Sequence, residues 1–204
     1  MERLMSGVME YPEGATPLDP DEMEGLKYPH VNTRGELDHL EQANIEEGLI
    51  WAGRRRGGDV LDDQFVRTFH KRLFGQVWDW AGTFRRTEKN IGIDPLHISV
   101  QLRLLLDDVR FWIDDGTYDP AEIAVRFHHK LVYIHAFPNG NGRYARIMAD
   151  LLMEEIFGLD PIDWSGGYDL QEMNERREAY IQALRAADGG DYGPLLDFAG
   201  YDKG

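Results

Sequence analysis

The chain has 204 residues, of which 42% are hydrophobic and none is cysteine, so it suits one domain and excludes disulfides and thiolate metal sites. It carries 37 acidic and 22 basic side chains, a formal net charge of −15, which disfavours general nucleic-acid binding. No apolar run approaches the length of a membrane span and no secretory signal is evident at the start, so we expect a soluble, cytoplasmic protein without a membrane partner.

The predicted elements follow an irregular start. Residues 1–35 are rich in Pro, Gly, Asp and Glu, which predicts an N-terminal arm over 1–35 and one domain over 36–204. Apolar residues then recur at helical spacing. Helices are predicted over about 37–51, 63–74, 95–114, 120–134, the stretch after the glycine loop to about 157, 169–187, and briefly after Pro194. Residues 83–94 predict a short β-hairpin. The expected fold class is mainly α, a helical bundle with one small hairpin.

The loop between two of these helices, His135-Ala-Phe-Pro-Asn-Gly-Asn-Gly-Arg-Tyr-Ala-Arg146, carries the strongest chemical signal. Gly140 and Gly142 let the backbone approach a ligand closely. Their amides and that of Asn141 precede a new helix, whose first N–H groups are unpaired and whose positive dipole end attracts phosphate. Arg143 and Arg146 are three residues apart, so both project from one side of the first turn and suit a polyphosphate.

Histidine at the end of the preceding helix completes the pattern. A neutral His135 imidazole beside a bound phosphate can take a proton from an attacking hydroxyl, and Phe137 is expected to anchor the loop by burial. A glycine turn alone is usually only a turn, and a lone histidine is more often a cap or solvated, but their joint occurrence in twelve positions favours a site. His128 and His129 are adjacent and diverge on a helix, so we expect one in the core and the other partly exposed, without a metal.

These residues resemble the signature of the Fic family, His-x-Phe-x-(Asp/Glu)-Gly-Asn-Gly-Arg-x-x-Arg, and the stretch from His70 to Arg85 is similar to upstream landmarks of the same family. Together the likeness covers about residues 35–185. Within the family, the stretches 41–45 and 87–92 resemble the bacterial mobile mystery protein B group. The resemblance implies a helical, Fic-type fold and a protein adenylyltransferase that moves AMP from ATP to a Ser, Thr or Tyr hydroxyl of a protein target.

The resemblance also implies a role for each matching residue. His135 would be the general base, and Arg143 and Arg146 would hold the β- and γ-phosphates. The anion hole for the α- and β-phosphates would be lined by Gly140, Asn141 and Gly142. Residues 83–94 would form a flap that aligns the target segment by strand pairing. The docking residues of that flap would be Thr87, Asn90, Ile91 and Gly92.

One position of the signature departs from the family pattern, and one further stretch bears on regulation. Asn139 stands where the family has the Asp or Glu that binds Mg²⁺, and one neutral carbonyl oxygen is a weaker ligand for Mg²⁺ or Mn²⁺. The stretch from Ala43 to Gly48 partly matches a family inhibitory motif, which implies that Glu47 pairs with Arg146. The alternative is that Glu47 is an exposed side chain on an acidic helix.

Three functions remain open on these residues. The first is AMP transfer to a protein hydroxyl. The second is transfer from another nucleotide or phospho-donor, because the motif fixes a diphosphate better than a base. The third is a non-catalytic nucleotide binder, one half of a toxin–antitoxin-like pair with an antitoxin partner, which Asn139 favours.

Overall fold

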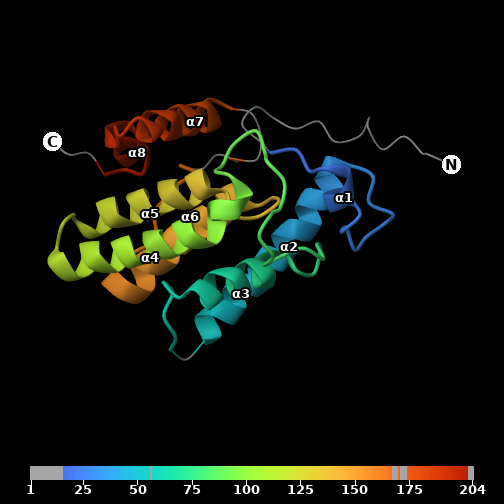
Figure 1. Cartoon of the computed structure of the whole chain (residues 1–204), viewed down its shortest axis with the longest axis horizontal. Coiled ribbons are helices and arrows are strands. Elements are labelled where there is room, and N and C mark those ends of the chain that lie inside the picture. Colours follow the sequence, from blue (N-terminus) through green and yellow to red (C-terminus); the bar gives the residue numbers. More distant parts are fainter. Residues whose placement is uncertain (1–15, 56, 167–169, 171–173, 202–204) are drawn as a thin grey trace.

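Helices and irregular loops make up the computed structural model, which describes residues 16–55, 57–166, 170 and 174–201. Figure 1 shows α4, α5 and α6 side by side, with the α2–α3 pair on one side and the α7–α8 pair on the other. The mainly helical class is confirmed, and none of the described helices is long and apolar enough to cross a bilayer. The elements are α1 (Pro20–Met23), α2 (Arg34–Arg54), α3 (Asp63–Phe74), the 3₁₀ turn η1 (Pro95–His97), α4 (Ile98–Asp115), α5 (Pro120–Ile134), α6 (Asn141–Leu152), the π-helical turn η2 (Met153–Phe157), α7 (Glu175–Asp188) and α8 (Gly193–Phe198).

The helices begin and end where side-chain caps and glycines dictate. Thr33 and Glu36 form a capping box at the start of α2, and the Asp62 carboxylate accepts from the Phe65 amide at 2.9 Å at the start of α3. Gly116 ends α4 in the left-handed region, with φ 64°. The last long helix, α7, begins at Glu175 rather than near residue 169; residues 167–169 and 171–173 lie outside the described part of the chain.

The predicted β-hairpin over 83–94 is wrong. All twelve residues are described, and they form an irregular loop with no paired strands. Hydrogen bonds from one side chain take the place of a ladder, because Arg85 donates to the carbonyls of Thr87 at 2.8 Å and Ile93 at 2.5 Å. The segment still folds back on itself, and we refer to residues 83–94 as the flap.

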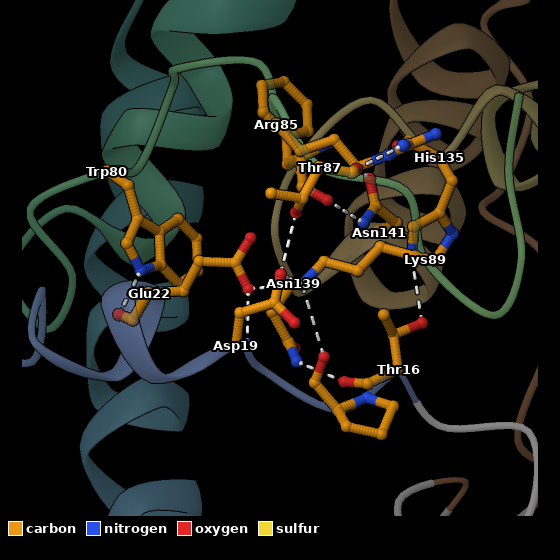
Figure 2. A network of polar contacts seen from close by, with 12 residues as sticks. Thr16, Asp19, Glu22, Trp80, Arg85, Thr87, Lys89, His135, Asn139 and Asn141 are labelled. Atoms are coloured by element: carbon orange, nitrogen blue, oxygen red, sulfur yellow. Dashed lines mark hydrogen bonds and ion pairs between the residues drawn. The ribbon is translucent and has the colours of Figure 1, made fainter. Parts of the chain in front are cut away.

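Residues 16–33, the described part of the predicted arm (1–35) that precedes α2, pack on the turn that follows α3. Leu26 and Trp78 form an isolated antiparallel bridge, in which the Lys27 amide donates to the Val77 carbonyl at 2.9 Å. The start of this segment also contacts the flap, through Asp19 and Thr87, and the loop after α5, through Thr16 and His135. Figure 2 shows these contacts from close by.

The expectation for the adjacent histidines of α5 is half wrong, because both are buried. His128 is 0% exposed and bonds the Tyr180 hydroxyl of α7 at 2.9 Å. His129 is 2% exposed and bonds both Asp188 and the Tyr192 hydroxyl at 2.9 Å. The two rings do diverge, but α7 and the turn before α8 cover the side of α5 that we expected to face solvent.

Candidate active site

The site begins where α5 ends. His135 adopts the left-handed conformation with φ 53°, and it is the only non-glycine residue in the described ranges with a positive φ. Its amide donates to the Leu131 carbonyl at 3.1 Å, which closes the last turn of the helix. A histidine held in this sparsely populated region marks a place where the surrounding loop fixes the backbone, as functional sites often do.

The loop after His135 is held from below by buried side chains. The Asn141 side chain accepts from the Phe137 amide at 3.0 Å and donates to the Phe137 carbonyl at 2.7 Å. Phe137 is 1% exposed, which confirms its anchoring by burial, and its ring stacks on His70 at 3.7 Å between centroids. The Asn141 side chain thus locks the loop, and only its backbone amide remains to face a ligand.

His70 supports the same loop from α3. Its Nδ1 accepts from the Gly82 amide at 3.1 Å, so Nε2 carries the proton and donates to the Asn139 carbonyl at 3.2 Å. Complete burial lowers the pKa of His70 to about 3, which keeps the ring neutral. One neutral histidine therefore connects α3, the turn at Gly82 and the motif loop.

The N-terminus of α6 forms the floor of a pocket. Gly140, with φ 78°, precedes the helix, and no side chain caps the first turn, so its amides point free of intrahelical partners. A Cβ on Gly140 would lie 2.8 Å from the Phe74 ring, so only glycine fits there. The Asn141 and Gly142 amides at the helix start therefore have no intrahelical partner, whereas the Gly140 amide donates to the Asn139 side-chain oxygen at 2.6 Å.

Arginines from three helices converge on this pocket in an otherwise acidic molecule. Arg143 and Arg146 both line it, as their spacing predicts, and Arg34 of α2 and Arg177 of α7 join them. No carboxylate is among the described residues that line the pocket. The lining residues are Thr16, Arg34, Ile91, Val132, His135, Asn139, Gly140, Asn141, Gly142, Arg143, Arg146, Arg177, Tyr180, Ile181 and Leu184. Such a concentration of guanidinium groups favours a ligand with several negative charges.

The first motif arginine has an acidic partner outside the pocket lining. Arg143 Nη2 lies 2.6 Å from Glu41 Oε2, and the Glu41 side chain is 3% exposed. The other Glu41 oxygen accepts from Trp78 Nε1 at 2.6 Å. The structure does not place Glu47 on Arg146: Glu47 is exposed, accepts a hydrogen bond from Gln76 and does not line the pocket.

The His135 imidazole is buried and neutral. It is 4% exposed, and burial, helped by the nearby Arg85 charge and opposed by the Val132 backbone, lowers the pKa of His135 to about 4. Its Nε2 lies 3.0 Å from the Thr16 hydroxyl. At neutral pH the ring can therefore accept a proton from a hydroxyl at this position.

The flap is fastened to the motif loop. Arg85 is 3% exposed, its side chain donates to the His135 carbonyl at 2.6 Å, and its amide donates to the Ala136 carbonyl at 3.0 Å. Gly92 lies so close that a Cβ there would come within 2.6 Å of the His135 Cβ. Of the expected docking residues, Ile91 lines the pocket, Thr87 bonds Asp19 at 2.8 Å, and Asn90 is exposed.

Asn139 is poorly arranged to hold a metal ion. Its amide oxygen accepts from the Gly140 amide at 2.6 Å. Its Nδ2 donates to the Thr16 carbonyl at 3.0 Å, which Figure 2 shows. Across the described part of the chain, no three His, Asp or Glu side chains cluster as a metal site would require. The residues present therefore do not fit a metal held by the protein, because Mg²⁺ and Mn²⁺ prefer free anionic oxygens.

A helical domain in which the start of one helix, four arginines and a neutral histidine surround one pocket defines a class of site suited to an anion. Comparison with known proteins identifies the family. Residues 60–153 match the family model described as Fic/DOC family. The chain belongs to the Fic/DOC family.

Relatives and solved structures support the assignment. The chain is 31% identical over 146 residues to protein adenylyltransferase fic-1 of Caenorhabditis elegans, which covers 68% of this chain and 26% of the relative. It is 25% identical to protein adenylyltransferase Fic of Nematostella vectensis, over 79% of this chain and 37% of the relative. The chain thus spans only about a quarter to two fifths of these curated relatives.

Two solved structures have a similar fold. A C. elegans Fic-1 structure matches with TM-score 0.64 and 25% identity, over 86% of this chain and 51% of that one. BepC, a translocated effector of Bartonella tribocorum solved with bound AMPPNP, matches with TM-score 0.64 and 16% identity over 93% of each chain. The second likeness is one of fold alone.

Several side chains of the site were not found by sequence reasoning. They come from segments far from the motif, and no spacing rule links them to it. The sequence could have pointed to Glu41 only through its position on an apolar face of a helix. Nothing in the local sequence marks the other side chains. They are Thr16, Arg34, Glu41, Lys89 and Arg177.

Proposed function

We propose that this chain is a protein adenylyltransferase, which transfers AMP from ATP to a Ser, Thr or Tyr hydroxyl of a protein target. One observation carries the proposal: a neutral, buried imidazole has a hydroxyl on its Nε2 at 3.0 Å, at the edge of a pocket lined by four arginines and the start of a helix. The adenylyltransferase names of the relatives point to the same reaction.

The reaction that this arrangement supports is an in-line displacement. The target hydroxyl oxygen attacks the α-phosphorus of ATP and gives its proton to Nε2 of His135. The bond between the α-phosphorus and the bridging oxygen breaks, and pyrophosphate leaves. Arg143, Arg146 and the first amides of α6 offset the charge on the phosphates, which is the main task of the protein in such transfers.

The metal ion has a different place in this proposal. Because the Asn139 oxygen is engaged by the Gly140 amide, we infer that Mg²⁺ or Mn²⁺ arrives as the counter-ion of the ATP phosphates. Weak binding of the metal by the protein itself follows. The metal requirement of the reaction should therefore follow the formation of the metal–ATP complex.

Labelled nucleotides test the proposed reaction. The full chain is incubated with a cell lysate, Mg²⁺ or Mn²⁺, and ATP labelled on either the α- or the γ-phosphate. Transfer of the α-label without the γ-label, lost in His135→Ala and retained in the exposed control His97→Ala, is the expected result. Transfer of the γ-label would instead indicate phosphoryl transfer, and preference for GTP or UTP would change the donor.

The state of Asn139 favours a second candidate, a non-catalytic or weakly active nucleotide binder in a toxin–antitoxin-like pair with an antitoxin partner. Its amide oxygen already accepts from the Gly140 amide, and none of the described residues that line the pocket carries a carboxylate. Calorimetric ATP binding without any transfer, even in Asn139→Asp, would support this candidate and overturn the enzymatic one.

A further inference from the structure

One hydroxyl of the chain itself occupies the position next to the base. Thr16 is 7% exposed, and its Oγ1 lies 3.0 Å from Nε2 of His135. Thr16 also lines the arginine pocket, so its oxygen lies at the boundary between the base and the phosphate cradle. A nucleophile must lie within hydrogen-bond reach of its base, and Thr16 meets that requirement.

Two residues of the motif loop, His135 and Asn139, hold Thr16 in this position. The Thr16 carbonyl accepts from Asn139 Nδ2 at 3.0 Å, so both its backbone and its side chain bond to residues of the signature. Figure 2 shows these two bonds converging on Thr16 from neighbouring residues of one loop. The hydroxyl is thereby oriented by contacts on two sides, which is the positioning that group transfer demands.

The flap holds the next residues of the same segment. Lys89 Nζ lies 2.8 Å from Asp19, contacts Glu22 as well, and its side chain is only 3% exposed. Thr87 adds a hydrogen bond to Asp19 at 2.8 Å. Because the Lys89 ammonium group is desolvated, removing either carboxylate would leave a poorly paired buried charge, which is costly. Side-chain ion pairs and a hydrogen bond thus hold residues 16–22, the docked segment, against the flap.

We propose that the docked segment is an intramolecular substrate and that Thr16 is a site of self-adenylylation. The inference rests on the proposed function and adds the acceptor residue. Thr16 Oγ1 forms a bond to the α-phosphorus of ATP, the bond from that phosphorus to the pyrophosphate oxygen breaks, and the Thr16 proton moves to Nε2 of His135. The products are AMP-Thr16 and pyrophosphate.

The same geometry makes Thr16 a competitor of other targets. While its hydroxyl occupies Nε2 of His135, no other hydroxyl can reach the base. Thr16→Ala removes every side-chain atom beyond Cβ from in front of the nitrogen, so transfer to other proteins should rise in that variant. The Thr16→Ser variant keeps a hydroxyl at the same position and should remain a substrate.

The test uses the full chain with α-labelled ATP and Mg²⁺ or Mn²⁺, followed by trypsin and mass spectrometry. Cleavage after Arg3 and Lys27 gives a peptide that contains three hydroxyl residues, Ser6, Tyr11 and Thr16, so fragment ions must locate the AMP. We expect AMP on residue 16 in the wild type, in Thr16→Ser and in the exposed control Thr117→Val. We expect none there in Thr16→Val or His135→Ala, and less in Asp19→Asn, which loses a charge that Lys89 holds.

Protein concentration separates reaction within one chain from reaction between chains. The fraction of Thr16 modified per unit time should not change over a tenfold dilution, and proportional slowing would overturn the intramolecular proposal. AMP on lysate proteins or on other residues, with none on Thr16, would overturn this inference and leave the proposed function intact. No transfer of α-label to any protein would remove both.

Discussion

The buried Glu41 carboxylate lies 2.6 Å from the Arg143 guanidinium, so an acidic side chain of α2 holds the arginine that the β-phosphate of a nucleotide is proposed to bind. Glu41 also accepts from Trp78 Nε1, and it is 2% exposed. The Glu41 carboxylate and the phosphate of a bound nucleotide would therefore compete for the Arg143 guanidinium. A protein that binds a ligand only in its folded state is stabilised by that ligand, so this competition is measurable by unfolding.

Replacing Glu41 by Gln should lower the stability of the nucleotide-free protein by about 1–3 kcal/mol, because Arg143 loses a buried partner. Saturating ATP should then raise the melting temperature more in Glu41→Gln than in the wild type, since phosphate supplies the missing negative charge. Glu46→Gln, exposed on the same helix, is the control. Equal shifts in all three proteins would show that Glu41 and the nucleotide do not compete.

Gly140→Ala should destabilise the chain more than Gly57→Ala. Both glycines have φ 78°, so each alanine pays about 1–2 kcal/mol for the left-handed conformation. At Gly140 the new methyl group also meets the Phe74 ring at 2.8 Å, whereas nothing lies within 4 Å at Gly57. Overpacking should add about 1–3 kcal/mol. Urea unfolding of the two variants measures the difference, and identical losses would contradict the close packing at Phe74.

Acid should affect the reaction only well below neutral pH. The pKa of His135 is lowered from 6.5 to about 4, so in the folded protein the base stays unprotonated down to about pH 4. An ordinary imidazole would already be mostly charged below pH 6.5. The acidic limb of kcat/KM should therefore lie near pH 4 rather than 6.5. An NMR titration of the His135 ring checks the assignment independently, and a midpoint near 6.5 would refute it.

The same shift has a stability consequence with a definite sign. Between pH 6.5 and about 4 the unfolded chain binds a proton at His135 that the folded chain does not, so the free energy of unfolding falls as pH falls through that window. The contribution amounts to about 3 kcal/mol at most. His135→Gln should flatten this part of the stability profile.

Asn139→Asp should lower the concentration of Mg²⁺ that transfer requires. An aspartate keeps an oxygen for the Gly140 amide and gains a second, charged one for the cation. It loses the donor to the Thr16 carbonyl, so the docked segment should bind more weakly. Metal titrations of the transfer rate measure the first effect. An unchanged metal requirement would mean that residue 139 does not approach the ion.

Local signals determined the helices but not every helix face. Capping residues such as Thr33 and Asp62 predict where α2 and α3 begin, because they act through neighbours in the sequence. The spacing of the inhibitory motif points to Glu47. It is six residues, or about one and two-thirds turns, beyond Glu41, so the two side chains leave α2 in different directions. Only Glu41 faces the buried side, and sequence periodicity in an acidic helix did not separate them.

The motif itself was predictable, and its surroundings were not. Gly140, Arg143 and Arg146 meet at one pocket because they share one helix start. Arg34, Arg177 and Thr16 reach that pocket from segments more than thirty residues away along the chain, so only tertiary packing brings them there. The hairpin prediction for the flap was wrong because the flap carbonyls accept hydrogen bonds from the Arg85 side chain instead of from a second strand. Local sequence does not reveal such a contact.

Arg85 holds the flap in place through main-chain contacts that do not depend on the side chains with which the flap would recognise a target. Its guanidinium bonds main-chain carbonyls at His135, Thr87 and Ile93, which every residue type possesses. Apart from Arg85 itself and Phe84, whose ring packs on Phe137, the side chains of the flap can therefore change without loosening the base, provided that the backbone keeps its course and Gly92 stays small. Such a loop can change its preferred targets during evolution while the proton-accepting centre behind it stays the same.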